Sequence, residues 1–119
     1  SPTKPQSHVK FIQLACRESE NLYLTDEVLN AVGTNWPAAV ATIVQRANDF
    51  GAKAQCLANA ANWDRQFDDL KPVINEVSNI IDPKHVHWTQ RVGVTVGRSK
   101  PTGQLATFLG DAVVASLWG

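Results

Sequence analysis

GTNWPAAVATIVQRANDFG, residues 33–51, contains the signals that begin, fill and end one amphipathic helix. Asn35 and Thr34 are both candidate N-caps, and Pro37 suits the first helical turn, where its missing N–H costs no hydrogen bond. Gly51 suits a left-handed cap at the other end. Apolar residues recur between these signals at helical spacing: Trp36, Val40, Ile43, Val44, Ala47 and Phe50. We therefore expect a buried helix that anchors the core and carries no chemistry itself.

Helical patterns continue on both sides of this stretch. Residues 25–33 begin with the N-cap candidate Thr25 and end at Gly33, and residues 52–61 are rich in alanine, the best helix former. Residues 9–17 form a short apolar run that suits a helix or a strand, and we expect a helix because the neighbouring segments are helical.

A further helix is expected after Pro72. Residues 63–70 suit a short helical turn before it. Asp82 precedes Pro83, which disfavours helical backbone and ends the helix there. The apolar stripe of this helix consists of Val73, Ile74, Val77, Ile80 and Ile81.

The pattern changes in the last third of the chain. Val92, Val94 and Val96 alternate with other residues at the period of two that is typical of a strand, and Val86 and Trp88 precede them. Residues 98–103 read as a turn. A C-terminal helix with Thr102 as N-cap is then expected, containing Leu105, Phe108, Leu109, Ala112 and Ser116. The alternative is a strand over residues 113–118 that pairs with residues 86–96.

These patterns predict a mainly α protein, an α-rich member of the α+β class. We expect a compact bundle of four to five short helices, with one extended segment or hairpin near residues 85–97 and a C-terminal helix. Residues 1–8, with two prolines and no apolar side chain, are expected to be a flexible tail, and residues 9–119 a single globular domain. An unpaired strand would need a partner for its backbone donors, which would make assembly between subunits a natural role.

Composition limits the class of protein further. The chain has 119 residues, of which 44% are hydrophobic, and no apolar run reaches the roughly 18 residues of a membrane span. Two cysteines, Cys16 and Cys56, are too few for a disulfide scaffold, so we expect both to be free, buried thiols. A cytoplasmic protein is favoured over a secreted one. A single bridge is the alternative for a secreted protein.

Charge is unevenly distributed along a chain whose net charge is zero. Residues 18–82 hold ten acidic residues against four basic ones, whereas residues 1–17 and 83–110 hold basic residues and no acid. Such asymmetry marks a partner surface or reflects internal pairing of the flanks with the acidic middle. We expect internal pairing, since the four basic residues of segment 83–110 are few for a surface that binds nucleic acid.

The sharpest candidate for chemistry is the pair His85 and His87. On a strand both imidazoles would face one side and could meet one metal ion, but no third ligand follows from the spacing. Asp64, Asp68 and Asp69 are a second candidate, as paired carboxylates for Mg²⁺, although a solvated face is the simpler interpretation. No cofactor is implied.

The basic segment 84–100 surrounds one aromatic residue, Trp88. Our first hypothesis is a non-enzymatic protein–protein interaction or assembly module, which binds a protein partner or a second copy of itself. Its candidate partner-binding residues are Trp88, Arg91, Arg98, Lys100 and Trp118. One alternative is a nucleic-acid-binding protein that uses segment 84–100. Another is a small metal-dependent enzyme that uses His85 and His87.

Overall fold

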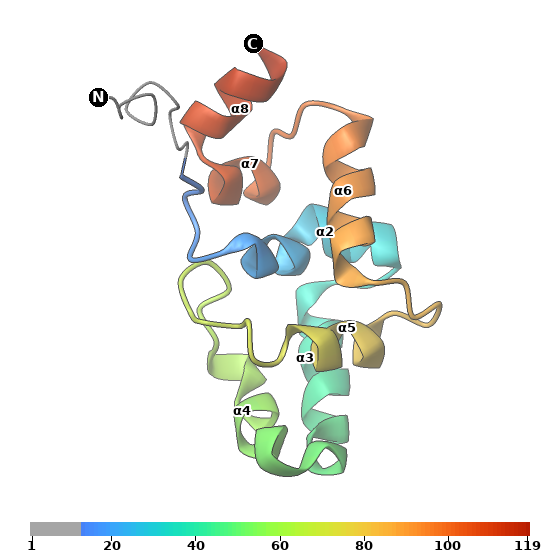
Figure 1. Cartoon of the computed structure of the whole chain (residues 1–119). Coiled ribbons are helices and arrows are strands. Elements are labelled where there is room, and N and C mark those ends of the chain that lie inside the picture. Colours follow the sequence, from blue (N-terminus) through green and yellow to red (C-terminus); the bar gives the residue numbers. More distant parts are fainter. Residues whose placement is uncertain (1–12) are drawn as a thin grey trace, which may run out of the picture.

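The computed structural model describes residues 13–119, which are mainly α-helical and contain no strand (Figure 1). The prediction of a mainly α protein is therefore confirmed. The α-helices are α2 (Asp26–Val32), α3 (Trp36–Arg46), α4 (Ala54–Ala58), α5 (Ile74–Ile81), α6 (Trp88–Arg98), α7 (Gln104–Leu109) and α8 (Asp111–Trp118). Short 3₁₀ helices are η1 (Ser19–Leu24), η2 (Ala47–Lys53) and η3 (Ala60–Asn62).

Helix α3 begins as its sequence predicts. The side chain of Asn35 accepts the Ala38 N–H at 3.0 Å, with Pro37 in the first turn. The α-helical part ends at Arg46, earlier than expected, and the chain continues as η2. Gly51 takes a positive φ of 54°, but it forms a kink within η2 instead of capping α3.

The predicted apolar stripe of α3 needs one correction. Ala39, Ile43 and Ala47 are the buried residues of this face, with Trp36 and Phe50 packed partly against the core. Val44 is exposed, because it lies one residue beyond Ile43 and so points about 100° away from it.

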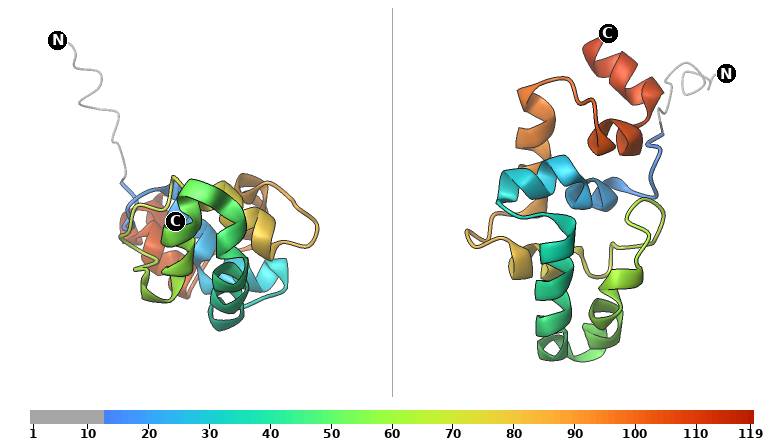
Figure 2. Two further views of the ribbon diagram at one scale, coloured as in Figure 1. Left: turned by 90° about the horizontal axis from the view of Figure 1, so that it is seen from below. Right: turned by 180° about the vertical axis from the view of Figure 1, so that it is seen from behind.

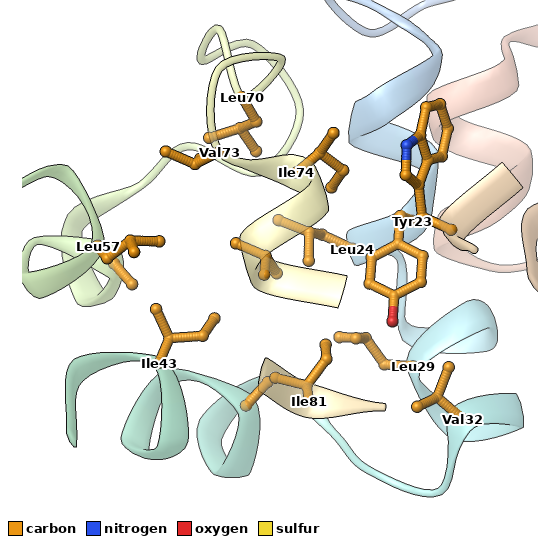
Figure 3. Packing of buried hydrophobic residues seen from close by; sticks show 14 of the residues in the cluster. Tyr23, Leu24, Leu29, Val32, Ile43, Leu57, Leu70, Val73, Ile74 and Ile81 are labelled. Carbon is orange, nitrogen blue, oxygen red and sulfur yellow. The ribbon is translucent and has the colours of Figure 1, made fainter. Parts of the chain in front are cut away.

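The core has two parts. The main cluster collects side chains from η1, α2, α3, α4, α5 and the start of α6, and Figure 3 shows Tyr23 between Leu24 and the α2 residues Leu29 and Val32. The second cluster joins the N-terminal segment and η1 to α7 and α8: Cys16, Leu22, Leu105, Phe108, Leu109 and Val113. Val92 of α6 packs against both clusters, so α6 spans the boundary between them.

The extended segment predicted near residues 85–97 is wrong from Trp88 onward, because this part is helix α6. Val92 and Val96 are four residues apart, a separation that fits both a strand face and one side of a helix. Trp88 adds a third apolar residue on that helical side and is buried in the main cluster. The burial of this face outweighs the low helix propensity of valine and glycine.

The C-terminal part is helical as predicted, but it forms two helices where one was expected. Gly110, with a φ of 89°, separates α7 from α8, and Gly103 is the N-cap residue of α7 where Thr102 was expected. A Cβ at Gly110 would lie 3.0 Å from the Cβ of Ala15, so the N-terminal segment crosses close to this break. The alternative of a strand over residues 113–118 is wrong, since these residues belong to α8 (Figure 2).

The helix expected over residues 9–17 is wrong for residues 13–17, which are not helical. Their backbone groups have partners elsewhere: the Ala15 N–H donates to the Phe108 carbonyl at 2.9 Å, and the Arg17 N–H donates to the Gln66 carbonyl at 2.8 Å. Residues 9–12 and the predicted tail 1–8 lie outside the described residues.

The ends of α5 and α2 follow the sequence signals, whereas the start of α2 does not. Helix α5 ends at Ile81, with Asp82 extended before Pro83 as predicted. Gly33 ends α2 with a φ of 101°. Thr25 precedes α2, but its hydroxyl donates to the Leu22 carbonyl at 2.7 Å instead of accepting from the helix. Residues 63–70 form a turn closed by the Asp68 N–H on the Asp64 carbonyl at 3.0 Å.

Candidate functional site

Helix α6 presents two different faces. Trp88, Val92 and Val96 follow one another four residues apart and pack against the two core clusters. Val94 lies halfway between the valines and points to the other side of the helix, where 55% of it is exposed. The alternating valines therefore divide into an inner pair and one outer residue.

A groove of about 210 Å³ runs beside this outer face, between α6 and α2. The two helices lie next to each other in Figure 1. The groove is lined by Ala31, Val86, Gln90, Arg91, Val94, Thr95 and Arg98. Its lining combines small apolar side chains with two guanidinium groups and contains no acid.

An ion pair anchors α6 beside this groove. The Nε of Arg91 donates to Oδ2 of Asp82 at 2.7 Å, and the Nη2 donates to Oδ1 at 2.9 Å. The Asp82 side chain is 0% exposed and that of Arg91 is 21% exposed, so the pair is largely shielded from water. The hydrogen bonds from Arg91 lower the pKa of Asp82, and those to Asp82 raise the pKa of Arg91.

The same end of α5 also positions the loop before α6. The Lys84 N–H donates to Oδ1 of Asp82 at 2.9 Å, and the Ser78 hydroxyl donates to the Val86 carbonyl at 3.3 Å. Ser78 and Asp82 are four residues apart, on one side of α5. Ser78 of α5 and Asp82, the residue that caps its C-terminus, thus hold Val86 and Arg91 at the groove.

Tyr23 is a buried residue next to this polar group. Its hydroxyl has no hydrogen-bond partner among the described residues, and burial raises the pKa of Tyr23 to about 12. The phenol therefore stays neutral and acts as a core side chain.

Some basic residues of the two flanking segments, 1–17 and 83–110, form ion pairs and others do not. Arg17 meets Asp69 at 3.9 Å and Arg91 meets Asp82, so two basic residues of the flanks pair with the acidic middle, as expected for internal complementarity. Arg98 and Lys100 are exposed, and neither makes an ion pair within residues 13–119. Arg98 is therefore a free cation at the groove.

The histidines His85 and His87 lie in the loop before α6 and at the N-cap of this helix. His85 lies in the loop with a φ of 53°, and His87 is the N-cap residue of α6, where its Nδ1 accepts the Thr89 N–H at 3.2 Å. Within the described part of the chain, no three His, Cys, Asp or Glu side chains are grouped to hold a metal ion. Metal binding stays a prediction of the sequence.

The acidic cluster has a local role. Oδ1 of Asp64 accepts the N–H groups of Gln66 and Phe67 at 2.9 and 3.1 Å, and Oδ2 of Asp68 accepts the Asp64 N–H at 2.8 Å. These carboxylates shape the turn in which they lie. Asp69 takes no part in these bonds and faces Arg17.

Two expected properties of single residues change with the fold. Trp88 is buried in the main cluster, so it is not an aromatic anchor on the surface. Trp118 is half-buried against the second cluster, and its role in partner binding stays a prediction. Both cysteines are free, as expected, but only Cys16 is buried. Cys56 is exposed on α4, which corrects the prediction that it is buried.

Sequence reasoning missed five groove residues: Ala31, Val86, Gln90, Val94 and Thr95. A helical reading of residues 88–98 would have found part of the groove, since Gln90, Val94 and Arg98 then follow one another at four-residue intervals. Nothing in the sequence pattern places Ala31 beside them.

No family model, curated protein or solved structure matches this chain. No helix within residues 13–119 is long and apolar enough to cross a membrane. The chain is a mainly α-helical protein, and its candidate site is the groove between α2 and α6, defined by its own residues.

Proposed function

We propose that this chain is a non-enzymatic protein-interaction module that holds a segment of another protein in the groove between α2 and α6. The observation that carries the proposal is Val94, an exposed apolar side chain that lines a groove with other apolar residues. Covering the exposed half of Val94 would contribute about 1 kcal/mol, since full burial of such a side chain contributes about 1.5–3 kcal/mol.

The size of the groove supports a macromolecular partner. Sites for small molecules are typically about 300–1,000 Å³. The groove, at about 210 Å³, is smaller and suits one or two side chains of a larger partner. A partner that inserts side chains between two helices uses a common mode of protein recognition.

The groove is also held in place before any partner arrives. The Asp82–Arg91 pair holds α6, and the Ser78 hydroxyl holds the backbone at Val86. Preorganised walls reduce the entropy that binding must lose. The apolar contact is proposed at Val94 instead of Trp88, because Trp88 is already buried in the core.

Peptide selection on the immobilised full chain tests this proposal. We expect selected peptides to bind the wild type and to lose at least about tenfold in affinity with Val94→Glu, because the substitution replaces the apolar contact with a carboxylate that a bound peptide would strip of its water. Val44→Glu is the matched control, since Val44 is a 40% exposed valine on α3 that does not line the groove.

Circular dichroism first establishes that both variants keep the wild-type helix content. Peptides that bind the Val94→Glu and Val44→Glu variants equally well would contradict the proposal. So would a selection that enriches nothing over a blank surface.

Nucleic-acid binding through segment 84–100 and catalysis at His85 and His87 stay predictions of the sequence. Gel mobility of DNA and RNA at low salt tests the first, with Arg98 and Lys100 substituted as controls. Metal analysis of the purified chain tests the second.

A further inference from the structure

We infer that the occupant of this groove is an acidic amphipathic helix, with an apolar side chain on Val94 and a carboxylate at Arg98. The inference rests on the proposed function and adds the chemistry and the form of the partner. It follows from the charge of the groove lining, from the spacing of Val94 and Arg98 along α6, and from the hydrogen bonds and ion pairs that the chain's own acids already make.

Charge favours an acidic occupant. Of the two guanidinium groups in the lining, that of Arg91 is paired with Asp82, whereas Arg98 is exposed and has no acidic partner within residues 13–119. The sequence from 83 to 110 supplies four basic residues and no acid. A carboxylate at Arg98 would complement this surface, and a cation there would meet repulsion.

Spacing and backbone geometry favour a helix as occupant. Val94 and Arg98 are one turn apart on α6, or about 6 Å along the axis at 1.5 Å per residue. An apolar residue and an acid four positions apart on an antiparallel or parallel helix reproduce this separation. The walls come from α2, α6 and the loop before α6, and none of these is a strand edge, so an extended segment would gain no sheet pairing.

The chain itself is a poor source of this segment. Residues 1–12 contain Lys4 and Lys10 but no acid. In the described part, five carboxylates are in ion pairs, those of Asp26, Asp49, Asp69, Glu76 and Asp82. Glu27 accepts the Leu105 N–H at 2.9 Å at the start of α7. Asp64 and Asp68 accept backbone N–H groups of their own turn. Most of the chain's acids are therefore engaged, and we place the segment on a different protein with free acids of its own.

Three synthetic helical peptides test the inference against the full chain. Each has an alanine-rich sequence with one leucine and with glutamate, glutamine or lysine four positions both before and after it, so that one charge reaches Arg98 in either orientation of the peptide. Fluorescence anisotropy is expected to rank them glutamate, glutamine and lysine in falling affinity, with about a two- to fivefold gain for glutamate over glutamine, as for exposed charge pairs. That gain falls with added salt.

Charge reversal supplies the decisive variant. With Arg98→Glu, the lysine peptide is expected to bind better than the glutamate peptide, and with Val94→Glu the glutamate and glutamine peptides lose affinity. Arg46→Glu is the matched control, because Arg46 is an exposed cation on α3 outside the groove. It should leave the ranking unchanged.

The other outcomes overturn the inference in distinguishable ways. The glutamate and glutamine peptides could bind equally well and both lose affinity with Val94→Glu. This result would contradict the acidic character of the partner but would leave the interaction function standing. If none of the three peptides binds, an acidic helix is not the occupant. The proposed interaction function is then still tested by the peptide selection. Self-association lost with Arg98→Glu in sedimentation makes a second copy the occupant. Binding of a single-stranded DNA probe in place of the peptides makes the partner nucleic acid.

Discussion

Replacing Arg91 with methionine is the sharpest test of how the groove is held. Methionine keeps an unbranched stem but removes the two hydrogen bonds to Asp82. The carboxylate, 0% exposed, then keeps the Lys84 N–H as a partner but has no counter-charge. Removing one member of a buried ion pair costs about 3–5 kcal/mol, because the other charge stays buried and uncompensated.

We expect the lower end of this range. The Arg91 side chain is 21% exposed, so water can approach the carboxylate once the guanidinium is gone. Arg91→Met should therefore lower the free energy of unfolding by about 3 kcal/mol, which in a chain of this length lowers the Tm by roughly 10 °C. Urea denaturation at neutral pH, followed by tryptophan fluorescence, measures this change.

Arg46→Met is the control for this experiment. Arg46 and Asp49 form an ion pair whose side chains are 50% and 62% exposed, so its loss should change stability by no more than about 0.5 kcal/mol. The double variant Asp82→Asn with Arg91→Met should be more stable than Arg91→Met alone, since no charge is left buried. If Arg91→Met destabilised the protein no more than Arg46→Met, the reasoning would be refuted.

The pH dependence has a definite sign. Arg91 lowers the pKa of Asp82 in the folded state, so the ionised carboxylate favours folding. This stability is present above the unfolded-state pKa of about 3.9 and is lost as the pH falls through the lower folded-state value. Urea denaturation should show a steeper loss of stability on acidification in the wild type than in Asp82→Asn.

Four further predictions concern other parts of the chain. Gly93→Ala should raise the free energy of unfolding by about 0.5–1 kcal/mol, because Gly93 lies in α6 and nothing lies within 4 Å of an added Cβ. Gly33→Ala should lower the free energy of unfolding by about 1 kcal/mol, since Gly33 has a φ of 101°. Thermal melts measure both glycine variants, and a shift of both in the same direction would contradict this argument. Asn35→Ala removes the α3 cap and should cost about 1 kcal/mol in urea denaturation, whereas an unchanged midpoint would mean that the cap contributes nothing. A disulfide-exchange reagent should modify the exposed Cys56 in the folded chain and Cys16 only on unfolding, since burial raises the pKa of Cys16 to about 11, and two rapidly reacting thiols would show this to be wrong.

The predictions that succeeded depend on neighbouring residues. Asn35 caps α3, Gly33 ends α2, and Asp82 before Pro83 ends α5, as their local sequences indicate. Each of these signals acts within one turn of the backbone, through a side-chain hydrogen bond, a positive φ or a steric clash. Such interactions are encoded in a few adjacent residues, so they can be read without the fold.

The prediction that failed most completely was the extended segment near residues 85–97. A spacing of two residues and a spacing of four both place Val92 and Val96 together, so the alternation of valines did not distinguish strand from helix. The start of α6 was also hidden, because its N-cap residue is His87, which is not among the common N-cap types. The error moved Val94 from the surface to the same side as its neighbours.

The local sequence is sufficient for the mainly helical class and for the ends of α2, α3 and α5. Packing between distant segments set the rest. Trp88 entered the main core and Arg91 met Asp82, which made residues 88–98 helical against their propensity. Only a helix at residues 88–98 turns Val94 outward and brings it beside Ala31. The groove between α2 and α6 depends on the relative positions of these two helices, and the side chains buried beneath both set those positions.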